Sequence, residues 1–493
     1  MKPIIGLSAG ILLLLASCKK SFFETSPSGS LTGKEAYSST KNIDALVNGT
    51  IRYQMESSTS QDNPGYSAII LSQEAMGGDA VLRDGVYGFL TTYGFRDPFD
   101  YTTRRALFFW TFQYKVIDNA NNIIANVDAA QGTDAEKRYL KGQALALRAW
   151  SYLNLVRQYQ FTYAKDRNAK GVPLYTTPTD PASQPKPRAT VAAIYDQVIA
   201  DLREADGLLQ GFNRTVKNRP DQKVVRGLLA RAFLTQENWD SAAVRAKQAR
   251  QGYPIMQPEE YSKGFNDVSN VEWIWGHPQA ADQNLGGASY FGYIDVTPAT
   301  GYRSVMADPH FRQLFADADV RKSLFRPVAD TTNPLLGWLM YTKFVNKPDQ
   351  SGHIVLMRSS EMALIEAEAR ARLTELPAAF AALNELRVKR SLPALPEGSL
   401  TKDQLVEEIL LERRRELWGE GFALPDLLRL QRPVVRTPST EVLDIPRQDG
   451  SIRKVPLKGH HQLKFPDGSN FTPNSAYLLF SIPLNEVNTN PNL

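Results

Sequence analysis

Residues that could carry chemistry are sparse in this chain. A Gly-x-Ser-x-Gly pattern, typical of serine hydrolases, appears at Gly6 to Gly10, but it lies inside an N-terminal apolar run that has the character of an export signal. The stretch from Gly29 to Lys34 is one residue short of a phosphate-binding loop and follows no predicted strand. We therefore expect no catalytic residue and no cofactor, and the chain is predicted not to be an enzyme.

Metal ligands are sparse as well. None of the five histidines stands at a metal-binding helical spacing from another histidine or from a cysteine, so no metal site is expected. These histidines are His277, His310, His353, His460 and His461. Paired carboxylates of the kind that cleave glycans could lie anywhere among the 52 acidic residues, so a surface glycan hydrolase remains an alternative.

The one cysteine, Cys18, closes the N-terminal apolar run. Lys2 precedes the run, Leu-Ala-Ser leads into the cysteine, and a segment rich in Ser, Pro and Gly follows it. This order is typical of a secretory signal, and Leu-Ala-Ser-Cys resembles the bacterial lipobox, where signal peptidase cuts before a lipidated cysteine. We predict a signal peptide at 1–17, a lipid anchor such as palmitate on Cys18, and a flexible tether at 18–33. A buried core cysteine is the alternative.

Charge and hydrophobicity are those of an ordinary globular domain. The 57 basic and 52 acidic residues give a net charge of +5, spread along the chain, which argues against a nucleic-acid partner. Hydrophobic residues make up 42% of the chain, and no second apolar run approaches membrane-spanning length. We therefore expect a soluble domain that is held to a membrane through its N-terminus.

Apolar periodicity predicts a mainly helical fold. Apolar residues at spacings of three and four indicate helices along much of the chain, and Thr190 has the sequence position of an N-cap. Two segments also carry small and aromatic residues at the positions of a tetratricopeptide unit, which predicts stacked helix pairs. The predicted helices begin near Lys34 and Arg104 and span 134–160, 191–209, 358–373, 378–389 and 402–417, and the repeat-like segments are 224–254 and 365–392.

Two stretches break the helical pattern. Residues 66–99 mix glycines with aromatic side chains and are predicted to be loop or short extended structure. Most of 257–348 is also irregular, and only Val271 to Trp275 alternates like a strand, which assigns Trp273 and Trp275 to the core. An irregular insertion of this length inside a helical scaffold is usually functional or disordered, and its aromatic content favours a function.

A dense charged run lies near the end of the predicted helices. Glu408, Glu412 and Glu416 recur every four residues with arginines between them, a pattern that ordinarily indicates a solvated ion-pair face. Trp418 and Phe422 follow at once, which argues against that ordinary interpretation here.

The run from Glu412 to Phe422, with Asp426-Leu427-Leu428-Arg429 after it, resembles the C-terminal signature of the SusD/RagB family of Bacteroidetes outer-membrane lipoproteins. Further matches follow the family's order along most of the chain. They are the lipobox and tether, Gly77 to Asp79, Ala146 to Leu153, Arg358 to Ala369, Ile482-Pro483 and Asn490 to Leu493.

The resemblance implies an all-α, mainly helical fold, in which a tetratricopeptide-like scaffold of helix pairs carries a loop-rich irregular face. It implies an N-terminal helical part at 34–256, a ligand-facing insertion at 257–350, and a C-terminal helical part with a tail at 351–493. Members of the family capture oligosaccharides, or sometimes peptides, for a SusC-like TonB-dependent transporter. We therefore expect that partner, non-catalytic binding, and a lipid-anchored place on the outer membrane facing the exterior.

Aromatic side chains in the two irregular stretches are the candidate ligand platform, because glycan sites stack sugar faces on aromatic rings. The candidates are Tyr87, Tyr93, Tyr290, Tyr293, Tyr302 and Trp338. Ordinary core or loop packing is the alternative for each ring.

Two other functions make different structural demands. A surface hydrolase needs two carboxyl groups about 5–10 Å apart in an open cleft. A protein-assembly scaffold of the tetratricopeptide type needs an exposed concave groove along the helix stack.

Overall fold

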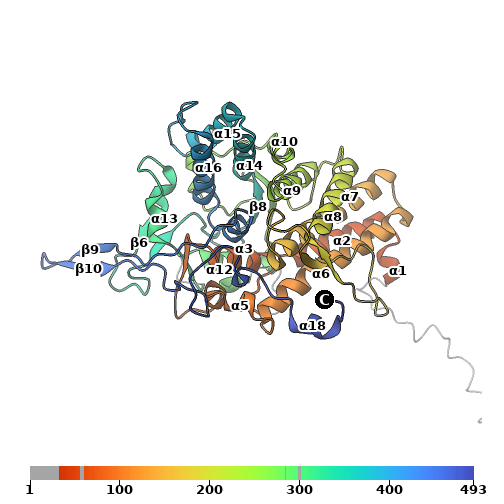
Figure 1. The fold of residues 1–493 in the computed structure, drawn as a ribbon, viewed down its shortest axis with the longest axis horizontal. Helices are drawn as coiled ribbons and strands as arrows, with labels where there is room; N and C mark the ends of the chain where they lie inside the picture. The colour runs from red at the N-terminus through yellow and green to blue at the C-terminus, as the bar shows by residue number, and fades with distance from the viewer. Residues whose placement is uncertain (1–32, 56–59, 284, 298–300) are drawn as a thin grey trace, which may run out of the picture.

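Long helices form an array on one side of the molecule, and short strands and loops gather on the other (Figure 1). The structure is a computed structural model that describes residues 33–55, 60–283, 285–297 and 301–493. The predicted signal peptide, Cys18 and all of the tether except Gly33 lie outside the described residues.

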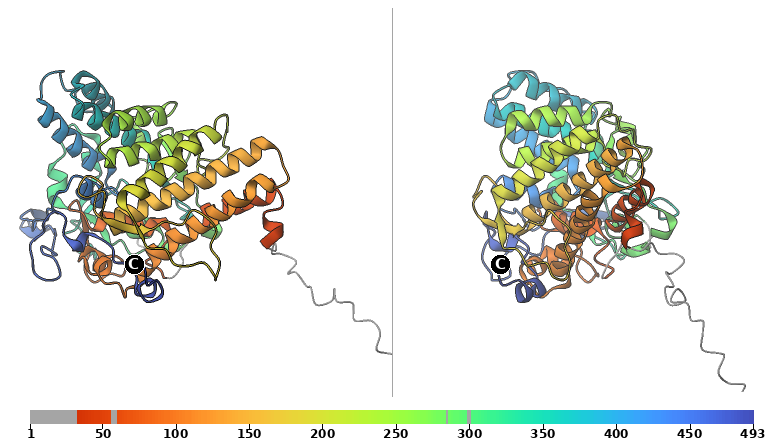
Figure 2. Two further views of the ribbon diagram at one scale, coloured as in Figure 1. Left: turned by 45° about the vertical axis from the view of Figure 1, so that its right-hand side comes forward. Right: turned by 90° about the vertical axis from the view of Figure 1, so that its right-hand side faces the viewer.

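Consecutive helices of the array pack on one another. α6 packs on α7, α7 on α8, α8 on α9, and α9 on α10, while α14 packs on α10, α15 and α16. Both views of Figure 2 show this stepped succession of helices. The predicted mainly helical fold built from helix pairs is therefore confirmed. The helices of the array are α2 (Thr40–Tyr53), α6 (Arg104–Asn126), α7 (Asp134–Tyr159), α8 (Val191–Leu208), α9 (Gln222–Thr235), α10 (Trp239–Arg250), α14 (Ser359–Arg372), α15 (Leu376–Val388) and α16 (Lys402–Leu417).

Capping and small side chains explain why these helices form and pack closely. The Thr190 side chain accepts a hydrogen bond from the backbone N–H of Ala193, which starts α8 at the predicted N-cap. α10 buries Ala242, Ala246 and Ala249 completely. Because these side chains are small, α9 and α14 can both approach α10 closely.

Short helices accompany the irregular part of the chain, and α3 corrects the prediction that 66–99 is loop or short extended structure. All residues from Ser67 to Ala75 are buried, so this helix has no solvent-facing side. Its sequence therefore lacks the alternation of apolar and polar residues by which an amphipathic helix is predicted. Only the part after α3 is mostly loop and short extended structure. The short α-helices are α1 (Gly33–Ala36), α3 (Tyr66–Ala75), α4 (Leu90–Tyr93), α5 (Arg96–Phe99), α11 (Pro258–Tyr261), α12 (Tyr290–Ile294), α13 (Pro309–Gln313), α17 (Ala423–Arg429) and α18 (Leu484–Thr489), and the 3₁₀ turns are η2 (Val127–Ala129), η3 (Ala281–Gln283), η4 (Gly286–Ala288), η5 (Val320–Leu324) and η6 (Ala476–Leu478).

The strands of the described residues pair two by two, and each pair is antiparallel. Trp273 and Trp275 of β4 are buried, as the strand-like alternation predicted. The hairpin β9–β10 projects from the body at the left of Figure 1. The pairs are β1 (Ala80–Leu82) with β5 (Val305–Ala307), β2 (Lys170–Pro173) with β3 (Arg188–Thr190), β4 (Trp273–His277) with β8 (Ile354–Arg358), β6 (Phe325–Pro327) with β7 (Leu339–Tyr341), and β9 (Val442–Pro446) with β10 (Ile452–Pro456).

A buried ion cluster, here called the Glu416 cluster, joins the helical array to the strands. Glu416 of α16 lies 2.6 Å from Arg358 of β8, 2.7 Å from Arg390 and 2.8 Å from Arg321, and all four side chains are fully buried. Arg358 also pairs with Glu272 at 2.8 Å, just before β4. Burial alone raises the pKa of Glu416, but the arginines outweigh it and hold that pKa well below its usual range.

Removing the central carboxylate should destabilise the fold strongly. The substitution Glu416→Gln leaves three buried guanidinium groups short of a counter-charge, so we expect the free energy of unfolding to fall by about 3–5 kcal/mol in urea denaturation. Glu407→Gln is the matched control. Its carboxylate pairs with Arg432 on the surface, where both side chains are exposed, so its loss should stay within about 0.5 kcal/mol.

The same cluster predicts a pH dependence. Because the folded pKa of Glu416 is depressed, its contribution is fully present above the ordinary glutamate pKa of about 4.3 and is lost as the pH falls through the folded value. As the pH is lowered, the free energy of unfolding should therefore fall more steeply in the wild type than in the Glu416→Gln variant. This role would be contradicted if the wild type and Glu416→Gln lost stability in parallel as the pH falls. A fall of only about 0.5 kcal/mol in the free energy of unfolding of Glu416→Gln at neutral pH would contradict it as well.

Candidate functional site

The β1–β5 pair brings the two irregular aromatic stretches together. In its register Ala80 lies opposite Ala307 and Leu82 opposite Val305. One step further, the Arg83 N–H donates to the Ser304 carbonyl oxygen at 2.8 Å. The loop that follows β1 and the segment that precedes β5 therefore leave the strand pair side by side, although more than 200 residues separate them in the chain.

Three tyrosines from these two segments form a tyrosine cluster, consisting of Tyr87, Tyr293 and Tyr302. The rings of Tyr293 and Tyr302 stack at 5.1 Å between centroids and 12° between planes, and Tyr87 tilts against Tyr302 at 5.3 Å and 41°. Tyr293 is fully buried, Tyr302 is partly exposed, and Tyr87 is 41% exposed. The cluster thus has a buried base and an exposed edge that can offer ring surface to a ligand.

Hydrogen bonds and a glycine fix the base of the cluster. The Tyr293 hydroxyl donates to the Gln61 carbonyl oxygen at 2.9 Å, and the Tyr302 hydroxyl donates to the Gln61 side chain. Gly88 adopts a φ of +131°, and a Cβ atom there would lie 2.7 Å from Cε1 of Tyr293. Only glycine permits this close approach without a shift of the ring.

A carboxylate lies at the exposed edge. Asp62 accepts a hydrogen bond from the Tyr87 hydroxyl at 3.1 Å and pairs with Arg105 at 3.1 Å, and Arg104 lies 4.0 Å away. Burial raises the pKa of Asp62, but Arg105 and the hydrogen bonds outweigh it and leave that pKa below its usual value. Asp62 is therefore suited to accept hydrogen bonds and poorly suited to act as the protonated acid that a glycan hydrolase requires.

A polar hollow of about 190 Å³ opens next to the cluster. Gly292, which precedes Tyr293, and Gly301, which precedes Tyr302, both line it, together with Asp295 and Lys347. A Cβ atom on Gly292 would lie 2.1 Å from the Gly287 carbonyl oxygen, so the backbones around the hollow need glycine to approach this closely. The hollow therefore lies beside the backbone that carries two of the three rings, and its lining is in part polar.

The other predicted platform residues have different surroundings. Tyr93 is fully buried, and its hydroxyl lies 2.8 Å from Nδ1 of His460. Tyr290 is buried and donates to the Gly419 carbonyl oxygen at 2.8 Å, while Trp338 is buried beneath Lys458. Since an irregular region has no long apolar faces, isolated large rings build its core, and these three leave no ring face for a sugar in this structure.

Several polar residues of the site were not among the sequence-based candidates. Asp62, Arg83, Arg104 and Arg303 carry no motif, and their place next to the tyrosines depends on strand pairing across the chain. The only local signal was that Arg303 follows Tyr302 directly in an aromatic, glycine-containing segment.

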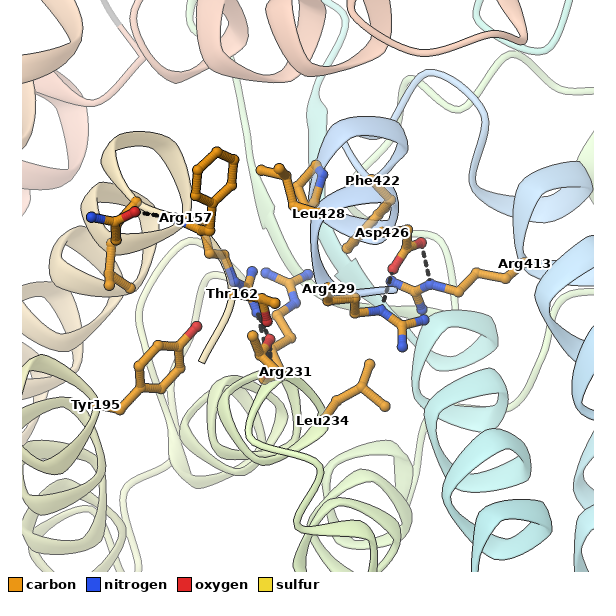
Figure 3. Close-up of a pocket in the computed structure, with 15 residues that line it drawn as sticks. Arg157, Thr162, Tyr195, Arg231, Leu234, Arg413, Phe422, Asp426, Leu428 and Arg429 are labelled. Atoms are coloured by element: carbon orange, nitrogen blue, oxygen red, sulfur yellow. Dashed lines mark hydrogen bonds and ion pairs between the residues drawn. The ribbon is translucent and has the colours of Figure 1, made fainter. Parts of the chain in front are cut away.

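Other cavities of the described residues differ in size and lining. The cavity in Figure 3 is lined by Arg157, Arg231, Arg413 and Arg429, and its volume of about 30 Å³ admits a water molecule or two but no sugar ring. Arg413 and Arg429 both donate to Asp426 at 2.6 Å there. The two larger spaces are a cavity of about 220 Å³ between residues 77–79 and the segment from α16 to α17, and an open groove of about 610 Å³ that includes the exposed Phe99 and Tyr101.

The described residues offer neither a metal site nor a membrane span. In that part of the chain, no three His, Cys, Asp or Glu side chains are grouped so that they could hold a metal ion. No helix within the same residues is both long and apolar enough to cross a membrane.

Two family models match the chain. One is described as starch-binding associating with outer membrane and matches residues 22–234, and the other is described as the SusD family and matches residues 329–493.

Solved structures and a curated protein are also similar. A SusD-like carbohydrate binding protein from Bacteroides vulgatus is 39% identical, with a TM-score of 0.86, and the match covers 92% of this chain and 97% of that one. A putative sugar binding protein from the same species is 26% identical, with a TM-score of 0.76 and coverage of 92% and 97%. SusD-like protein P38 of Formosa agariphila is 24% identical over 383 residues, which is 66% of this chain and 72% of that protein.

The base of the tyrosine cluster should tolerate no side chain at residue 88. Gly88→Ala adds a methyl group against Tyr293, whereas Gly85→Ala, the matched control, also has a positive φ of +69° but open space around its Cβ position. Both variants should lose stability through backbone strain, and Gly88→Ala should lose about 1–3 kcal/mol more in urea denaturation, because its methyl group overpacks Tyr293 and because its φ lies further from the left-handed region that alanine can adopt. Equal losses for the two variants would mean that Gly88 does not support the ring.

Proposed function

The chain belongs to the SusD family, whose members are non-catalytic binding proteins, and from that premise we propose that it is a lipid-anchored outer-membrane protein that captures oligosaccharides. In this proposal it faces the exterior and delivers its ligand to a SusC-type TonB-dependent transporter. The family prediction made from the C-terminal signature is confirmed by the 39% identical relative, which the match covers almost completely.

The observation that carries the proposal is the exposed edge of the tyrosine cluster. Tyr87 offers a ring face to solvent, Tyr302 lies against it, and the buried ring of Tyr293 holds Tyr302 in place. Sugars present flat apolar C–H faces and a fringe of hydroxyl groups, so they stack on such rings while nearby polar groups fix their orientation. The ionised Asp62 accepts a hydrogen bond from the Tyr87 hydroxyl and so holds this ring at the edge.

The ligand class is drawn from the relatives and from the shape of the site. The two Bacteroides vulgatus relatives are described as carbohydrate binding and putative sugar binding proteins. An open edge next to a shallow polar hollow suits a chain that extends past the site, such as an oligosaccharide, better than a small molecule that must be enclosed. A peptide is the other ligand that the family resemblance implies.

The N-terminal motif and the family match support the anchoring and delivery parts of the proposal. The match to a family described as associating with the outer membrane supports a membrane location. Acyl chains on Cys18 would add about 0.8 kcal/mol of membrane affinity per buried CH₂ group. A flexible tether after Cys18 would let the domain move over the mouth of a neighbouring transporter.

Removal of the exposed ring should weaken sugar binding. For each oligosaccharide that the wild type binds, we expect Tyr87→Ala to raise the Kd roughly tenfold, because a stacked ring contributes about 0.5–1.5 kcal/mol beyond its buried area. Isothermal titration calorimetry measures this change. The matched control is Tyr101→Ala, an exposed tyrosine in the open groove, which should leave every Kd unchanged. An unchanged Kd for Tyr87→Ala with all bound oligosaccharides would refute the stacking role.

The anchor is tested by fractionation of cells that express the full chain. Wild-type protein should appear in the outer-membrane fraction and incorporate labelled palmitate, whereas Cys18→Ala should lose the label and leave the membrane. Ser8→Ala, a change elsewhere in the predicted signal, is the control and should behave like the wild type. Membrane retention of Cys18→Ala without label would argue for a different anchor.

A further inference from the structure

We propose that the oligosaccharide bound at the tyrosine cluster is anionic, and that Arg83 and Arg303 bind its carboxylate or sulfate groups. The inference rests on the proposed function and adds the chemical class of the ligand. It concerns two arginines that the stacking proposal does not use.

Both arginines lie at the backbone segment that carries the partly exposed Tyr302, Arg303 within it and Arg83 across from it. Nη2 of Arg83 donates to the Tyr302 carbonyl oxygen at 3.0 Å, and Arg303 is the next residue in the chain. The Arg83 N–H donates to the Ser304 carbonyl oxygen, so Arg83 faces this segment across the end of the β1–β5 pair. An anion held by the two guanidinium groups would therefore lie near the sugar that stacks on the rings.

Neither guanidinium group has an anionic partner within the described residues. Arg83 and Arg303 make no ion pair there, and the Nε atom of each is buried without a hydrogen-bond partner. Asp84, which follows Arg83, is exposed and also makes no ion pair in this part of the structure. The neighbouring Arg104 and Arg105 differ in this respect, because both pair with Asp62.

This pair of like charges is an unfavourable arrangement without a ligand. Burial and the positive field of Arg303 lower the pKa of Arg83, and Asp84 opposes that effect only in part. A carboxylate or a sulfate ester can accept two parallel N–H hydrogen bonds from a guanidinium group, so a single anionic sugar can satisfy both arginines. A neutral sugar leaves the repulsion in place.

The backbone also holds Arg303 in an uncommon conformation. Its φ is +48°, in the left-handed region that residues with a side chain avoid. Two hydrogen bonds keep it there, from the Arg303 N–H to the Gly292 carbonyl oxygen and from the Ser304 N–H to the Tyr293 carbonyl oxygen, both at 2.9 Å. The same backbone that positions Tyr293 and Tyr302 therefore also positions the Arg303 side chain.

The test compares three oligosaccharides of equal length by isothermal titration calorimetry. They are an oligogalacturonate, which carries carboxylates, a sulfated galacto-oligosaccharide, and a neutral malto-oligosaccharide. We expect at least one of the acidic ligands to bind about tenfold or more tightly than the neutral one, and the tighter of the two acidic ligands identifies carboxylate or sulfate as the preferred group. This preference should shrink as the salt concentration rises.

The arginine variants then assign the preference to the site. Arg83→Gln and Arg303→Asn should each weaken binding of the acidic ligand about tenfold or more and leave the neutral ligand nearly unchanged, because hydrogen bonds to charged groups contribute about twice as much as neutral ones. Asparagine is chosen at 303 because it tolerates a positive φ. Arg83→Lys keeps the charge without the two parallel donors, so its affinity for the acidic ligand should lie between those of the wild type and Arg83→Gln. Arg453→Gln, a partly exposed and unpaired arginine of the described β9–β10 hairpin, is the control.

Each outcome separates the inference from the function on which it rests. Equal binding of acidic and neutral ligands, or an acidic preference that survives both arginine variants, overturns the inference and leaves oligosaccharide capture standing. If no oligosaccharide of either kind binds to folded protein, the proposed function fails and the inference fails with it. Thermal unfolding of each variant checks that a lost affinity is not lost folding.

Discussion

Glu416 lies in the interior with three arginines around one carboxylate, and this arrangement constrains much of the molecule. A buried charge is tolerated only when its partners surround it, so α16, β8 and the chain near Arg321 and Arg390 must meet with little freedom. Three residues further along, the Gly419 carbonyl oxygen accepts a hydrogen bond from Tyr290. Because Tyr290 begins α12 and Tyr293 belongs to the same helix, the turn that follows the Glu416 cluster also sets the base of the tyrosine cluster.

The strand β1, which leads into the loop that carries Tyr87, depends on the same turn. Arg414 pairs with Asp79 at 2.6 Å, and the Trp418 indole N–H donates to the Asp79 carbonyl oxygen at 3.1 Å. β1 begins one residue after Asp79, and Gly78 comes so close to the Val435 carbonyl oxygen that a Cβ atom would lie 2.2 Å from it. The start of β1 and the position of α12 are therefore both fixed by the segment from Arg414 to Gly419.

The sequence predicted what depends on local pattern and missed what depends on tertiary contact. Thr190 could be identified as an N-cap because capping is a local interaction, and the signature from Glu412 to Phe422 identified the family. The helix α3 was missed because burial on every side removes its amphipathic period. Residue type alone could not separate Tyr87 from Tyr93, since both lie in the same aromatic, glycine-containing stretch. Tyr93 is buried by packing against His460, His461 and Arg436, which are distant in the sequence.

The division between scaffold and proposed site would allow ligand preference to change without loss of the fold. The residues that hold the segments together, such as Glu416 and Asp79, act through paired charges whose removal leaves a buried or partly buried charge uncompensated. Tyr87 lies in an exposed loop, and the Arg303 guanidinium group makes no hydrogen bond or ion pair to the described residues. Substitution at these two positions therefore costs the fold little, while it alters the surface that a ligand meets.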